Sequence, residues 1–190
     1  NQTALSVVNT SENAKAVKVR FLEGQNSREV LDFNLYLSPY DVWTAAIYDD
    51  AGTPTLITTD TSCTVPWLYE AGGVQPFLPW ALTDKKWQED GETYDDISRG
   101  SEGHFEMIEM GTMADATEED ASGNVTNVNG SAAAATHVDG MPANCPQLSE
   151  AWTRGAVPAD NGYWIDDPFA DMSAPSGGLF GGAAIVNVER

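Results

Sequence analysis

The sequence predicts an all-β fold, an antiparallel β-sandwich of immunoglobulin-like or jelly-roll-like type with long acidic loops and little helix. Apolar and polar residues alternate with a period of two in several short segments, which is typical of half-buried strands. The 190-residue chain contains 17 glycines and 10 prolines, and many of them separate these segments as turns. Short strands between such turns favour a sandwich over a fold that alternates strands with helices.

The clearest element is a hairpin over residues 17–39, with the turn EGQNS at its tip. In its first strand, Val17, Val19 and Phe21 alternate with Lys18 and Arg20. Side chains with this period fall on opposite faces of a sheet, so the two charged side chains are expected to face solvent. In the second strand we expect Leu31, Phe33, Leu35 and Leu37 to enter the core, and Asp32, Asn34 and Tyr36 to lie on the opposite face.

Further strands are predicted from ALSVV near the N-terminus, and from residues 41–50, 55–65, 103–111 and 181–189. Residues 83–103 and 111–136 break the alternation because they are acidic, small and polar. We expect long loops there, with at most a short helix in TEED or SAAAAT. One domain over residues 1–190 is expected. Its last apolar run stops at Arg190, so the chain also resembles the N-terminal part of a longer protein.

The charge balance excludes several kinds of partner. There are 29 Asp and Glu residues against 9 Lys and Arg residues, for a net charge of −20. Such a surface repels nucleic acid and anionic membranes. No apolar run approaches the roughly 20 residues that a spanning helix needs, so membrane insertion is not expected. The partners that remain are proteins, further copies of the chain, and glycans.

The two cysteines, Cys63 and Cys145, allow one pairing. The chain has no C-x-x-C spacing, which disfavours a zinc or redox site. We expect an intramolecular disulfide, with two free buried thiols as the alternative.

No residue is predicted to be catalytic. His104 and His137 are too few for a three-histidine zinc site, and a Ser-His-Asp arrangement would lack the G-x-S-x-G context. Acidic pairs such as YDD and IDDP could bind calcium or act as acid and base on a glycan, but no calcium-loop motif is present and the metal ligands stay unknown.

Residues 65–82 concentrate aromatic side chains among prolines. Trp67, Tyr69, Phe77 and Trp80 are therefore the candidates for contact with a ligand or partner, or else they cap the core. Four N-x-S/T sequons, at Asn1, Asn9, Asn124 and Asn129, permit glycosylation without showing it.

The run VVNTSENAKAVKVRFLEGQNSREVLDFNLYLSPYDVWTAAI, with TDTSCTVP, GHFEMIEMG and LFGGAAIVNVE, resembles a family of uncharacterised secreted bacterial proteins. The resemblance covers about half of the chain and implies export to the cell surface or beyond, with no known catalytic residues. We therefore expect a secreted, non-catalytic sandwich that acts as a structural, assembly or adhesion module. The alternatives are a carbohydrate-binding module, with or without calcium, and an acid-acting hydrolase.

Overall fold

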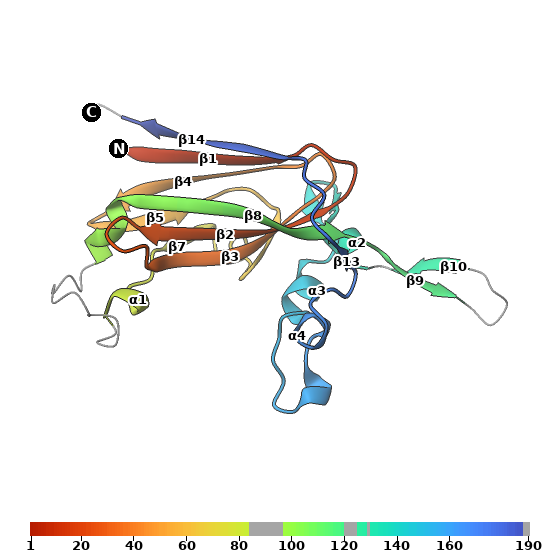
Figure 1. Cartoon of the computed structure of the whole chain (residues 1–190). Coiled ribbons are helices and arrows are strands. Elements are labelled where there is room, and N and C mark those ends of the chain that lie inside the picture. The colour runs from red at the N-terminus through yellow and green to blue at the C-terminus, as the bar shows by residue number, and fades with distance from the viewer. Residues whose placement is uncertain (84–96, 120–124, 129, 188–190) are drawn as a thin grey trace.

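The computed structural model describes residues 1–83, 97–119, 125–128 and 130–187. Two antiparallel five-stranded sheets pack face to face, as Figure 1 shows, which confirms the predicted all-β sandwich. The first sheet has the order β14-β1-β4-β5-β7, with β1 (Gln2–Asn9), β4 (Val42–Asp50), β5 (Thr53–Ile57), β7 (Val74–Pro76) and β14 (Leu179–Val186). The second has the order β13-β8-β2-β3-β6, with β2 (Lys15–Glu23), β3 (Glu29–Leu37), β6 (Cys63–Val65), β8 (Gly103–Met113) and β13 (Met172–Ser173).

The β2–β3 hairpin has the predicted alternation. Val19 lies opposite Phe33 and Arg20 opposite Asp32. The inward side chains of β3 are buried between the sheets, where Phe33 packs against Trp43 with ring centroids 5.8 Å apart. On the outer face, Lys18 pairs with Asp32, and Arg20 pairs with Glu29. These ion pairs are partly exposed, so each is worth at most about 1 kcal/mol and burial dominates.

A second apolar cluster covers one end of the outer face of the second sheet. Tyr36 points outward as predicted, yet it is fully buried because short helices lie over it. Its ring stacks on Trp164, and its hydroxyl accepts a hydrogen bond of 2.6 Å from Trp152 Nε1. The covering elements are α2 (Ser131–Ala135), β11 (His137–Val138), β12 (Met141–Pro142), α3 (Cys145–Glu150), a 3₁₀ turn at Pro158–Asp160 and α4 (Tyr163–Asp166). Figure 1 shows α3 and α4 below the sandwich and α2 at its end.

The predicted disulfide is confirmed, and it ties this helical layer to the sandwich. Cys63 on the edge strand β6 is bonded to Cys145 at the start of α3, and both residues are buried. The bond closes a loop across 82 residues. A loop of this length is worth roughly 4–5 kcal/mol in the chain-entropy account.

The polar segments differ in part from the expected loops. Residues 84–96 lie outside the described ranges. Within 111–136 the short helix allowed in SAAAAT is present as α2, but β9 (Ala116–Glu119) and β10 (Val125–Val128) form a hairpin that projects from the sandwich where a loop was predicted. Two short elements lie at the other end, α1 (Trp80–Thr83) and a 3₁₀ turn at Ile97–Ser101. No helix in the described ranges is long and apolar enough to cross a membrane.

Substitutions on the two faces of β3 should differ sharply in cost. Phe33→Ala removes a fully buried ring and should lower the free energy of unfolding by about 3–5 kcal/mol. Asp32→Ala removes one exposed ion pair and should lower it by less than about 1 kcal/mol. Urea unfolding measures both values, and equal losses would contradict the assignment of the faces.

Candidate functional site

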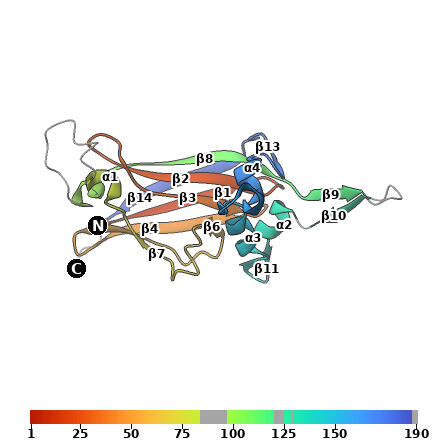
Figure 2. The same ribbon diagram turned by 90° about the horizontal axis from the view of Figure 1, so that it is seen from below.

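The four aromatic candidates do not form one platform. Phe77 belongs to the main core, with its ring 5.4 Å from that of Phe21. Trp67 packs against the cluster under the helices, with Tyr69 beside it at a ring distance of 6.4 Å. Trp80 is 59% exposed on α1, which Figure 2 places at the opposite end of the sandwich from α3. A flat sugar ring therefore cannot stack on all four at once.

His137 is held in a hydrogen-bonded cluster that differs from a catalytic triad. Ser38 Oγ lies 2.6 Å from His137 Nδ1, and Asp41 Oδ2 lies 3.4 Å from the same nitrogen. In a triad the serine and the carboxylate contact different ring nitrogens. Here Nε2 faces the Thr61 hydroxyl at 3.2 Å instead. The backbone N–H of His137 also donates to Ser38 Oγ, so the cluster joins β11 to the turn after β3.

Asn9, the acceptor residue of one sequon, serves the fold. Its side chain is fully buried, and its amide nitrogen donates to the carbonyl oxygens of Asn13 and Ser38, each at 2.7 Å. Its amide oxygen accepts from the backbone N–H and the hydroxyl of Ser11. A glycan on this nitrogen would replace one of its two hydrogens, so it would break one of these bonds and would have to fit into a fully buried site.

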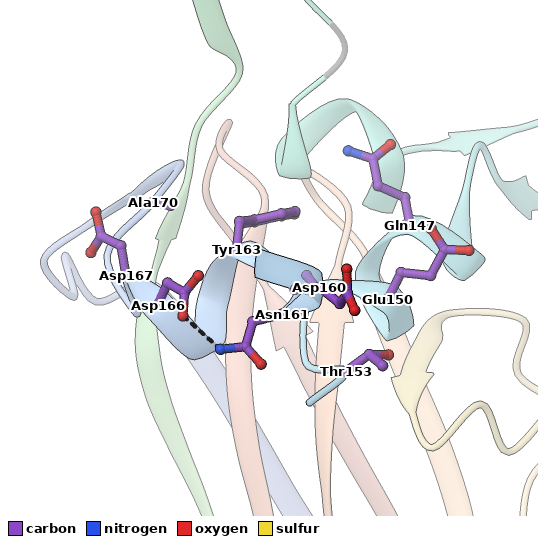
Figure 3. Close-up of a pocket in the computed structure, with 11 residues that line it drawn as sticks. Gln147, Glu150, Thr153, Asp160, Asn161, Tyr163, Asp166, Asp167 and Ala170 are labelled. Carbon is purple, nitrogen blue, oxygen red and sulfur yellow. Dashed lines mark hydrogen bonds between the residues drawn. The ribbon is translucent and has the colours of Figure 1, made fainter. Parts of the chain in front are cut away.

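The helical layer contains an open hollow of about 740 Å³ with an acidic rim, shown in Figure 3. Asn161 donates to Asp166 Oδ1 at 2.8 Å and so spans part of this rim. Burial, together with nearby Asp171, raises the pKa of Tyr163 to about 12, so its hydroxyl stays protonated at neutral pH. In the described part of the chain, no group of three or more His, Cys, Asp and Glu side chains has the arrangement of a metal site.

The edge strand β14 is exposed along nearly its whole length. It pairs with β1 along its whole length, from Leu179 opposite Asn9 to Val186 opposite Gln2. Among the described strands, none pairs with its other edge. All of its residues except Leu179 are exposed, and Phe180 and Ile185 are exposed by 73% and 82%. The strand LFGGAAIV contains neither a charged residue nor a proline.

Two backbone hydrogen bonds fix which groups of β14 are free. Asn9 N–H donates to Asp41 O, and Thr10 N–H donates to Gly178 O. In an antiparallel pair, directly opposed residues exchange both bonds at every second position. Even-numbered residues of β1 therefore bond to β14, and the odd-numbered ones bond to β4. By the same alternation, the N–H and C=O groups of Gly182 and Ala184 point to β1, whereas those of Gly181, Ala183 and Ile185 point away from the sheet.

The other side of the sandwich is built differently. Its edge strands β6 and β7 are only three residues long, and β7 ends in Pro76. Short edge strands and prolines are devices by which natural sheets avoid pairing with another chain. On one side of the sandwich the edge strands are thus short and poorly suited to pairing. On the other side the eight-residue strand β14 has no described partner on its outer edge.

A polar latch closes one end of this open side. The Glu109 carboxylate accepts from Lys15 Nζ at 2.7 Å and from the backbone N–H groups of Ser176 and Gly177 at 3.0 and 2.8 Å. Lys15 is fully buried and also donates to Thr112 and Ser176. The latch therefore fixes the segment between β13 and β14, and with it the point from which β14 begins.

Comparisons of the chain with protein-family profiles, with curated proteins and with solved structures found no match. Of the residues named from the sequence, the disulfide pair Cys63 and Cys145 is confirmed. The aromatic residues Trp67, Tyr69, Phe77 and Trp80 stay a prediction as contacts for a ligand or partner. The edge strand β14 offers the clearest open geometry.

The free energy of unfolding should fall in acid, because Glu109 becomes protonated and its ionic contacts are lost. Burial raises the pKa of this carboxyl, but the bonds from Lys15, Ser176 and Gly177 outweigh burial and lower it below the ordinary value of 4.5. A lowered folded-state pKa stabilises the fold above the unfolded-state pKa, and the contribution is lost as the pH falls through the folded value. Glu109→Gln should therefore destabilise the fold at pH 7 and flatten its stability profile below 4.5.

The matched control is Glu106→Gln on the same strand, because Glu106 is more exposed and pairs only with Arg20 among the described ion pairs. Urea unfolding across the acid range compares the variants with the wild type. An unchanged acid profile for Glu109→Gln would contradict the latch.

Proposed function

We propose that this chain is a non-catalytic module of the cell surface or extracellular space, which works in assembly or adhesion by adding the open edge of β14 to another strand. The observation that carries the proposal is β14 itself, a long, exposed, uncharged edge strand with unpaired backbone groups. Such an edge is a template for strand addition, in which main-chain hydrogen bonds supply affinity.

The charge distribution supports contact at this strand. The chain carries a net charge of −20, so most of its surface repels a similar molecule. Residues 179–186 carry no charge, and neither do the outward positions of the neighbouring β1, which are Gln2, Ala4, Ser6 and Val8. Another acidic chain can approach this region with the least electrostatic cost.

The disulfide supports a location at the cell surface or in the extracellular space. Disulfides persist in oxidising environments and are rare in the cytosol of most organisms. Cys63 and Cys145 are buried against the second cluster, so their bond belongs to the folded architecture.

Blocking the free edge without disturbing the sheet should abolish association. The N–H of Ala183 points away from β1, so Ala183→Pro removes a donor from the open edge and none from the β1–β14 ladder. Sedimentation velocity should show a wild-type associated fraction that rises with protein concentration, and a monomeric Ala183→Pro variant. Ala183→Lys, which adds the charge that natural edges use, should act in the same direction.

Ala184→Pro is the matched control, because the N–H of Ala184 points to β1 and its loss should lower the melting temperature more than Ala183→Pro does. A wild type that stays monomeric, or an Ala183→Pro variant that still associates, would contradict strand addition at β14.

A further inference from the structure

A second open edge lies on the same side of the sandwich. Strand β8 pairs with β2 from Gly103 to Thr112, but β13 covers its other edge only at Thr112 and Met113. Among the described strands none pairs with that edge over 103–111, and only its Gly111 end is covered, by Met172 and Ser173. Phe105 and Met107, which lie along it, are half-buried and pack against the main core.

The two open edges are antiparallel and aligned. The latch places the start of β14 beside Glu109, through the bonds to Ser176 and Gly177. At the other end, Ile185 and Phe105 line the same hollow of about 320 Å³ between the sheets. Figures 1 and 2 show β14 and β8 on the same side of the two layers. The open side is thus a seam that runs between two strands of similar free length.

The two carboxylates of β8 have cationic partners inside the chain, which lowers their cost to an approaching strand that carries no charge. Glu106 lies 3.2 Å from Arg20, and Glu109 lies 2.7 Å from Lys15. Both cations come from β2, on the side of β8 that is away from the seam. The edge therefore offers free backbone groups and half-buried apolar side chains rather than unpaired carboxylates.

We propose that the seam binds a second copy of this chain, so that β14 of each copy adds to β8 of the other. This inference rests on the proposed function and names its partner. A two-fold axis parallel to the strands brings β14 against β8 of the second copy, in the antiparallel direction that the two strands already have within one copy. The contact is isologous, since each copy contributes the same two edges. Both sheets then continue from one copy into the other, and the half-buried Phe105 and Met107 are covered.

Charge favours this arrangement over the other two-fold pairing. An axis perpendicular to the strands would join β14 to β14 and β8 to β8, which brings the carboxylates of two β8 strands together. The parallel axis instead sets each β8, with Glu106 and Glu109, against a strand that carries no charge. Like charges placed opposite each other on neighbouring strands are destabilising.

The alignment predicts which residues meet. An axis parallel to the strands keeps positions along them, so Ile185 of one copy lies near Phe105 of the other, as it does within one copy. Three residues further along both strands, in opposite chain directions, Gly182 comes near Ile108. A Cβ at Gly182 would meet open space, and Ile108 is 50% exposed, so both positions accept a cysteine.

The experiment mixes Gly182→Cys and Ile108→Cys proteins, each with its native disulfide intact, and treats the mixture with a short bismaleimide. We expect a covalent dimer in the mixture and at least tenfold less from either protein alone. Val157→Cys, exposed in the helical layer, replaces Gly182→Cys in the control and should give no dimer. Mass spectrometry of the digested dimer identifies the joined residues.

A dimer joined at 182 and 108 supports the proposal. Efficient cross-linking of Gly182→Cys with itself would show that β14 pairs with β14, which overturns this inference and leaves assembly at β14 standing. Wild-type protein that sediments as a monomer throughout would overturn the proposed function as well.

Discussion

The pairing of β2 with β3 is the contact on which both apolar clusters depend. One face of this hairpin supplies Val19, Phe33 and Leu35 to the core between the sheets. The opposite face supplies Ala16 and Tyr36 to the cluster under the short helices. Because side chains alternate strictly along a strand, a shift of the pairing by one residue would empty both clusters together. The helical layer, the disulfide and the position of β8 beside β2 all follow from this register.

The strands could be predicted from the sequence because their alternation is local. The hairpin, its two faces and the strand near residues 181–189 are each visible in a few consecutive residues. The neighbour of that last strand is not, because β1 lies at the other end of the chain and no local pattern reports the pairing. The burial of Tyr36 was equally hidden, since the helices that cover it have only four to six residues and no apolar period.

The candidate sites were harder to predict, because they depend on distances between remote segments. Trp67 and Trp80 are close in sequence, yet Trp67 follows β6 and Trp80 begins α1, and Figure 2 shows these two elements well apart along the sandwich. His137 meets Ser38 and Asp41 only when β11 folds back onto the turn after β3. The sequence also does not show which backbone groups of β14 are free, because this alternation is set by the hydrogen bond from Thr10 to Gly178.

When an acidic chain associates with another copy of itself, repulsion between like charges opposes the contact. Here Glu106 and Glu109 of β8 are paired with cations of β2, and β14 carries no charge. The opposite side is protected by short strands and a proline. The molecule thus carries a large net negative charge, yet one of its sides has an uncharged edge strand that is open to pairing. The proposed assembly depends on this asymmetry.

Amide hydrogen exchange along β14, resolved by residue and measured at low and high protein concentration, tests the central claim most directly. The free amides of Gly181, Ala183 and Ile185 should exchange fast in dilute protein and slow down on concentration, whereas those of Gly182 and Ala184 should be protected in both. Equal protection of odd and even residues in dilute protein, or fast exchange of the odd residues at every concentration, would contradict a free edge that another strand completes.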